Sequence, residues 1–366
     1  MSDKRNDKIT RRQTLAAILA ASMVPAMTRH ARAAEPDFGA FNTAFAAKVI
    51  LPALDNLVKV TDSFAATAAA FDAANGAGDF DKVRQGFNNV ADAWASAQQF
   101  RLGALAQEQR SERFAYWPER RNVVDKQYRA LLAGKGKEGL EAAQFATGSV
   151  AVQGLPALER LLYESVSADG DQAKRRSAVI LAIANNLKSI AAEAKAVWEK
   201  TLQDPALAAN TFAANPAEGT AQSYTNLLTI TQVIADQKIG APLGGDAAAA
   251  KPKAAEQWRS GRSMRNIVLN LTTARGSVLN PGGFADLLGA DKAALKADLT
   301  KAFDDSIAAA KAVGDNFAED IAHQEMRKPV TALLVKINHL RDLLRQQVPP
   351  AIGITLGFNE LDGDGS

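Results

Sequence analysis

The chain has 366 residues, of which 47% are hydrophobic and 23% charged, and it contains no cysteine. A cysteine nucleophile and a disulfide framework are therefore excluded. The first 33 residues hold seven of the 43 basic and two of the 40 acidic residues, so the formal charge changes from +3 for the whole chain to −2 for the remainder. This balance argues against binding to nucleic acid or to an anionic membrane surface, which requires clustered positive charge.

Residues 1–33 have the features of an export signal. Arg11 and Arg12 follow a polar start, an apolar run extends from Leu15 to Met27, and Ala31-Arg32-Ala33 forms a small-x-small cleavage site. The arginine pair resembles the twin-arginine type of signal, although an ordinary secretory signal with a chance pair is the alternative. We therefore expect a periplasmic protein. It should have no lipid anchor, because that requires a cysteine, and no membrane span, because no later apolar run is long enough.

Hydrophobic side chains recur at steps of three and four residues through most of the chain. Three such stripes are Leu54, Leu57, Phe64 and Phe71; Ile180, Ile183, Leu187, Ile190, Ala194 and Val197; and Val330, Leu333, Ile337, Leu340 and Leu344. This period is typical of amphipathic helices, and no segment shows a convincing alternation with the period of two that indicates a strand. The sequence therefore predicts an all-α protein with little or no sheet.

Clusters of Gly, Pro, Asn and Asp separate the predicted helices. We expect helices near residues 38–75, 80–108, 138–165, 172–203, 220–238, 262–278, 291–313 and 316–346. After the leader of residues 1–33, the stretch 204–219 divides these helices into two four-helix bundles, over 34–205 and over 206–366 with a C-terminal tail. Residues 246–255 predict a mobile surface loop.

Few residues offer the chemistry of a catalytic site. The sequence has neither the Gly-x-Ser-x-Gly elbow of a serine hydrolase nor a phosphate-binding loop. After the leader only His323 and His339 remain, and on one helix they would lie roughly 160° apart. They could share a metal ion only if Pro329 bent the chain sharply, so we expect each to lie on the surface or between helices.

Several segments together resemble one known family. They are residues 114–118 (FAYWP), 152–162 (VQGLPALERLL), 258–263 (WRSGRS), 356–359 (LGFN) and 362–364 (DGD). In this order they are similar to the imelysin-like family, which includes insulin-cleaving and iron-regulated periplasmic proteins. The resemblance spans about residues 38–364 and implies an all-α fold of two four-helix bundles, in agreement with the predicted helices.

The family's motif, Gly-x-His-x-x-Glu, is proposed to bind a metal through its histidine and glutamate. The matching residues here are Gly154, Pro156 and Glu159, so the histidine is replaced by a residue with no ligand atom. Proline fits the first turn of a helix, where its missing donor is not needed, and Pro156 is therefore predicted to begin a helix. Glu159 could still be one ligand of a carboxylate site for iron or another divalent metal, but a solvated or salt-bridged glutamate is the commoner case.

Basic residues surround two tryptophans in the family segments. Trp258 has Arg259, Arg262 and Arg265 beside it, and Trp117 is flanked by Arg110, Arg113, Arg120 and Arg121. If these segments meet, Trp117, Trp258, Arg259 and Arg262 could form a pocket for an anionic ligand. In the alternative, the tryptophans fill the core between the bundles and the arginines pair with nearby acids.

The sequence thus favours a non-enzymatic binding or accessory protein, which the resemblance links to iron or metal uptake. Its partner would be a metal ion or a periplasmic iron-uptake protein. A metallopeptidase of the imelysin type with an atypical site is one alternative, although Pro156 argues against hydrolysis. A helical scaffold for a periplasmic partner protein is another.

Overall fold

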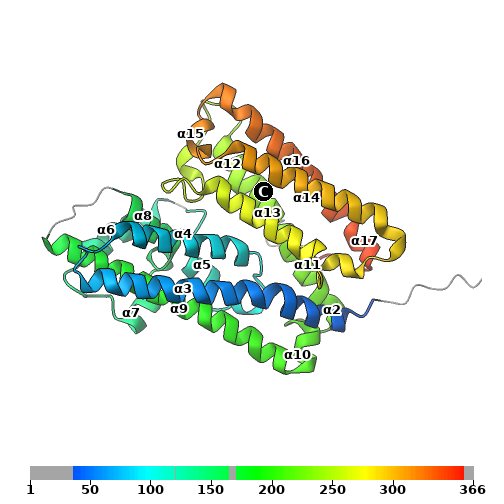
Figure 1. Cartoon of the computed structure of the whole chain (residues 1–366), viewed down its shortest axis with the longest axis horizontal. Helices are drawn as coiled ribbons and strands as arrows, with labels where there is room; N and C mark the ends of the chain where they lie inside the picture. Colours follow the sequence, from blue (N-terminus) through cyan, green and yellow to red (C-terminus); the bar gives the residue numbers. More distant parts are fainter. Residues whose placement is uncertain (1–35, 120, 165–169, 358–366) are drawn as a thin grey trace, which may run out of the picture. The chain divides into compact units, whose positions relative to one another are not determined.

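The computed structural model describes residues 36–119, 121–164 and 170–357 (Figure 1). Throughout these residues the regular structure is helical, and no strand occurs among them, which confirms the all-α prediction. The predicted leader, Arg120 and the family segments beyond residue 357 lie outside the described residues. None of the helices described here combines the length and the apolar character needed to cross a membrane.

Four helices form the first bundle: α3 (Leu51–Ala73), α4 (Phe80–Ala97), α8 (Leu155–Tyr163) and α9 (Gly170–Gln203). Helix α3 packs against α4 and α9, and the short α8 contacts the same two partners. The predicted stripes face this core. Leu54, Leu57, Phe64 and Phe71 are buried on α3, as are all members of the α9 stripe except the partly buried Val197. The buried faces explain why these segments are helical, because tertiary packing supplies most of a helix's stability.

The second bundle consists of α11 (Pro216–Gln232), α13 (Ser263–Leu279), α14 (Ala293–Val313) and α16 (Arg327–Gln346). Helix α14 contacts α13 and α16, and α11 also contacts both of them. All five residues of the predicted C-terminal stripe are fully buried on α16. A π-helical turn, Val233–Gly240, continues α11 and places Lys238 on its buried side.

Contacts also connect the two bundles. Helix α2 (Phe38–Phe45) leads through a π-turn at Ala46–Ile50 into α3, yet α2 contacts α11 and the short α10 (Pro205–Asn210). Helix α4 packs against α13. The division at residues 205 and 206 remains a prediction about domain organisation.

Three predicted helices are wrong in extent. The helix expected over 80–108 ends at Ala97 and is followed by 3₁₀ turns and α5 (Arg110–Phe114). The one expected over 138–165 is divided into α7 (Ala142–Ala146), a 3₁₀ turn at Val150–Val152 and α8, because Gly148, Gly154 and Pro156 interrupt it. The last one breaks after α15 (Phe317–Asp320) and resumes only at Arg327. Helix α6 (Val123–Ala133) was not predicted.

Candidate functional site

The start of α8 is formed by Gly154 and Pro156. A Cβ atom on Gly154 would lie 2.1 Å from the carbonyl oxygen of Phe114, so only glycine permits this close approach of two backbone segments. Pro156 occupies the first turn of α8, which confirms its predicted role as a helix-start residue. These two residues set the position of Glu159, one turn further along the helix.

Glu159 is buried, with 3% of its surface exposed. Its Oε1 atom accepts hydrogen bonds from the backbone N–H of Ser260 at 2.9 Å and from the Ser260 hydroxyl at 2.6 Å. Burial raises the pKa of the Glu159 carboxyl above its usual range, and the bonds from Ser260 oppose this rise. The expectation of a solvated or salt-bridged glutamate is therefore wrong, since no ion pair involves Glu159 among the described residues.

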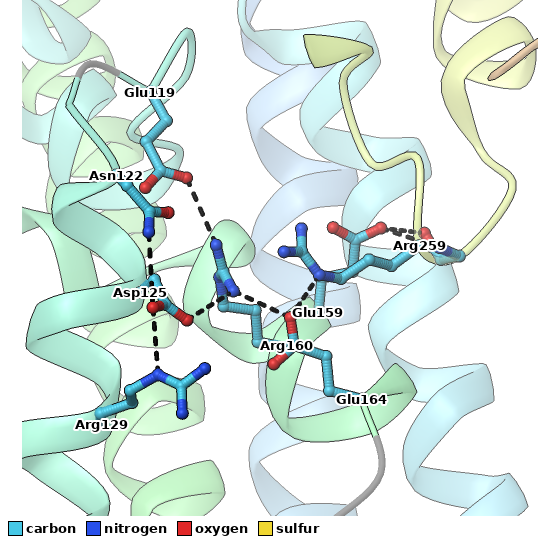
Figure 2. A network of polar contacts seen from close by, with 9 residues as sticks. Glu119, Asn122, Asp125, Arg129, Glu159, Arg160, Glu164 and Arg259 are labelled. Atoms are coloured by element: carbon cyan, nitrogen blue, oxygen red, sulfur yellow. Dashed lines mark hydrogen bonds and ion pairs between the residues drawn. The ribbon is translucent and has the colours of Figure 1, made fainter. Parts of the chain in front are cut away.

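A chain of charged side chains lies next to Glu159 (Figure 2). Arg160 is buried and donates hydrogen bonds to Asp125 at 3.1 Å and to Glu164 at 2.8 Å. It also forms an ion pair with Glu119, whose Oε2 atom lies 3.6 Å from Arg160 Nη2. Glu164 in turn accepts a hydrogen bond from Arg259 at 2.6 Å. Arg129 pairs with Asp125 as a third arginine, so each arginine of this network faces a carboxylate and the network joins α6, α8 and the 259–260 turn.

A cavity of about 310 Å³, which we call the Glu159 cavity, opens beside this network. Three segments line it, namely residues 115–119, the beginning of α8, and residues 253–259. Trp117, Trp258 and Arg259, predicted to form a pocket, are indeed brought together here. The Arg259 guanidinium lies 4.4 Å from the centre of the Trp258 ring, and Lys253 lies 5.7 Å from the same centre.

Arg262, the fourth predicted pocket residue, is not among those that line the cavity. It is buried against Asp92, which also accepts hydrogen bonds from Arg265. Arg110 pairs with Glu108 and Glu193, and Arg113 donates to the amide oxygens of Gln153 and Asn186. The arginines therefore mostly pair with nearby acids and amides, while the two tryptophans line a cavity instead of filling a closed core.

Three functional candidates were not singled out from the sequence: Ser260, Glu256 and Lys238. The Lys238 side chain is buried, and its Nζ donates to Glu256 Oε2 and to Asn270 Oδ1, each at 2.8 Å. Glu256 lines the Glu159 cavity, and Lys238 lies 5.8 Å from the centre of the Trp117 ring. Lys238 continues the buried positions of α11 and the π-turn, and this spacing was a signal that could have placed it in the core.

The donor set at this site does not fit a metal ion. Pro156 supplies no ligand atom, Glu159 accepts from Ser260, and the Glu256 carboxylate is neutralised by Lys238. Among the described residues no group of three or more His, Asp or Glu side chains could hold a metal. His323 and His339 are both exposed, the first in the break before α16 and the second on α16 itself.

Comparison with known proteins agrees with this architecture. The chain is similar to an imelysin-like protein from Psychrobacter arcticum 273-4, with 22% identity, a TM-score of 0.75, and coverage of 88% of this chain and 97% of the other. It is also similar to a protein of Parabacteroides distasonis ATCC 8503 named provisionally as an iron-regulated protein A precursor, with 16% identity, a TM-score of 0.65, and coverage of 87% and 97%.

At these identities the two structures establish a shared fold. Among curated proteins, none matches the sequence significantly. The imelysin family model, which is classed among peptidases, matches residues 50–347. Since this match spans most of the chain and confirms the resemblance of the sequence segments, the protein belongs to the imelysin family.

Proposed function

We propose that this protein is a non-enzymatic binding or accessory protein of the periplasm, connected with iron uptake. The leader-like residues 1–33 support export, and the name of the Parabacteroides distasonis structure supports a connection with iron and with a precursor form. The ligand-binding part of this proposal rests on the Glu159 cavity.

The observation that carries the proposal is the position of Pro156. It stands where the family motif has histidine, and it lies at the start of α8 with Glu159 one turn away. A hydrolytic zinc site normally uses three protein ligands and a bound water. Here the two buried carboxylates have other partners, Ser260 and Lys238, and this supports binding over metal-assisted hydrolysis as the proposed role.

The cavity offers aromatic faces and both signs of charge to a ligand. Glu119, Glu159 and Glu256 are balanced by Arg160, Lys253 and Arg259. Among the described residues, Lys253 forms no ion pair, and its ammonium group lies against Trp258. A bound molecule would therefore meet Trp117 and Trp258 as its apolar walls and Lys253 as an available cation at the rim.

The first experiment compares wild-type protein recovered from the periplasm with Glu159→Gln. We expect metal analysis to find no stoichiometric metal in either protein, and added iron, zinc or calcium to leave the melting temperature of both unchanged. We also expect neither protein to hydrolyse a denatured protein substrate. Stoichiometric metal and hydrolysis in the wild type, both lost in Glu159→Gln, would establish the metallopeptidase instead.

The second experiment tests binding directly by native mass spectrometry of the periplasmic protein. We expect a bound small molecule that is lost in Trp258→Ala, because its ring forms a wall of the cavity. Phe212→Ala is the matched control, since this aromatic residue lies outside the Glu159 cavity. Iron-limited growth of a deletion strain, complemented by the wild type and not by Trp258→Ala, would connect the site with uptake. Full complementation by Trp258→Ala would contradict that connection.

A further inference from the structure

A second cavity, of about 370 Å³, lies on the other side of residues 115–118. Its walls come from the end of α4, from α5, from α11 and from the π-turn Val233–Gly240. Residues 115–118 and Glu256 line both cavities, so Trp117 and Pro118 belong to a wall that the two share. The volume is within the range of small-molecule sites in proteins.

Four amide side chains line this space: Gln98, Gln99, Asn226 and Gln237. We call it the glutamine cavity. Within the described residues, Nε2 of Gln98 and Oε1 of Gln99 are buried without a hydrogen-bond partner. The side chains of Asn226 and Gln237 form no hydrogen bond with any residue that the structure describes. Buried polar groups are nearly always paired, so the unpaired atoms of Gln98 and Gln99 point to a ligand that would complete them, and the partly buried amides of Asn226 and Gln237 offer further donors and acceptors beside them.

The formal charges in the wall are already compensated. Arg101 donates to Glu112 at 2.8 Å, and Glu256 accepts from Lys238 at 2.8 Å. A charged ligand would lose part of its hydration in this cavity without gaining an unpaired counter-charge. The electrostatics therefore favour an uncharged ligand.

Aromatic side chains complete the cavity. Trp94, Tyr116 and Trp117 line it, and Trp94 is held rigidly because its ring stacks on Phe114 with centroids 4.3 Å apart. An aromatic ring provides a flat apolar surface, whereas amides provide donors and acceptors side by side. A molecule with an apolar ring face and a rim of hydroxyl groups would match both the aromatic surface and the amides.

We propose that the glutamine cavity binds a neutral polyhydroxylated small molecule with the chemistry of an uncharged sugar or cyclitol. This inference does not depend on the ligand in the Glu159 cavity, because the four amides that carry it line only the glutamine cavity, although both cavities share the wall at Trp117. The hydroxyl groups would pair with the amides of Gln98, Gln99, Asn226 and Gln237, and the ring would pack against Trp117.

The test uses the full protein and titration calorimetry with glucose, trehalose and myo-inositol as neutral probes, and glucuronate and glucosamine as charged ones. We expect at least one neutral probe to bind, and to bind more tightly than either charged probe. Gln237→Leu should weaken this binding by about five- to tenfold, the equivalent of one lost hydrogen bond. Gln346→Leu, at an exposed glutamine on α16, should leave it unchanged.

The proposal is overturned if no neutral probe binds, if a charged probe binds as tightly, or if Gln237→Leu binds like the wild type. Gln237 forms no side-chain hydrogen bond within the described residues, so its replacement should not impair folding, and a melting curve checks this. Glu159→Gln should bind the neutral probe normally. If the sugar-binding proposal fails, the function proposed for the Glu159 cavity is unaffected. If that function fails, the sugar-binding proposal is likewise unaffected.

Discussion

Glu159 illustrates how one residue's chemistry depends on its partners. The carboxyl is removed from water, which penalises its charged form, and two hydrogen bonds from Ser260 offset part of that penalty. An acid whose pKa is raised in the folded state binds its proton more tightly there than in the unfolded chain. Its ionisation therefore destabilises the fold as the pH rises from the ordinary pKa of the carboxyl to the raised value, and the full cost is present above it.

Replacing Ser260 by alanine should make the protein sensitive to alkaline pH. The hydroxyl bond to the ionised carboxylate is lost, which raises the pKa of Glu159 further. We expect a loss in unfolding free energy of about 1.5–3 kcal/mol at pH 8 and a smaller loss below pH ~4, where the carboxyl is protonated in both states. Urea denaturation at the two pH values measures this difference. An equal loss at both would contradict the assignment.

At the scale of the residue, the sequence predicted the role of Pro156 in the family motif but not the surroundings of Glu159. Pro156 was predicted to begin a helix from its own backbone chemistry, a local property that the sequence contains. The burial of Glu159 depends on Ser260, 101 positions away, whose contact is created by folding. Carboxylates are mostly exposed, and that general tendency led to the wrong prediction for this one.

The π-turn after α11 carries the second buried charge of the site. Lys238 lies inside it, 1% exposed, and reaches Glu256 in the turn before α13 and Asn270 on α13 itself. Asn266 donates to the same carboxylate oxygen at 2.9 Å. One ion pair thereby fixes the π-turn and the 252–262 segment, which together supply walls of both cavities.

Lys238→Met should be strongly destabilising, because it leaves the buried Glu256 carboxylate without a cation. We expect a loss of about 3–5 kcal/mol in unfolding free energy. The double variant Lys238→Met with Glu256→Gln should recover part of it, since the unpaired charge is removed and Asn266 keeps an acceptor. Urea denaturation of the three proteins tests this. Additive losses would show that the pair is not coupled.

A matched control for Lys238→Met is the pair of Lys301 with Asp305, an i,i+4 pair with side chains 75% and 43% exposed. Lys301→Met should leave the urea denaturation midpoint nearly unchanged, because solvent screens exposed ion pairs. A loss as large as that of Lys238→Met would show that burial is not the cause.

At the scale of the element, long uninterrupted stripes were predicted well and the segments around the site were not. α9 and α13 follow their predicted ranges closely, because their hydrophobic period and flanking breaks agree. The region from Ala97 to Leu155 contains short helices and turns whose form depends on contacts with other segments. Gly154, for example, is required by the backbone of Phe114, which no local pattern reveals.

On the scale of the whole molecule, Asp92 connects the two bundles. It lies on α4 and accepts hydrogen bonds from Arg262 and Arg265 at the start of α13, and these two helices pack together. Arg262 is buried, and burial lowers its pKa to about 10. The pairing therefore compensates a costly buried charge at a contact between the bundles.

Asp92→Ala should weaken this contact by leaving Arg262 buried without its partner. Asp92 is partly exposed, so we discount the cost of a fully buried pair and expect about 2–3 kcal/mol, or a melting temperature lower by about 3–4 °C for a folded part of this size. Scanning calorimetry provides the measurement. Asp304→Ala, which removes the more exposed pair with Arg275, is the control and should change the melting temperature little.

The sequence by itself determined the all-α class, the buried stripes and the family, because these depend on periodic local patterns and on ordered segments. It also suggested, from the basic residues around Trp117 and Trp258, a pocket that these tryptophans could form with Arg259 if their segments met. Only the tertiary structure decided which charges are buried and what they face. In the folded protein, hydrogen bonds join Arg262 with Asp92, Glu159 with Ser260 and Glu256 with Lys238. Such pairings join residues far apart in the chain, and their energies depend on the water that folding excludes.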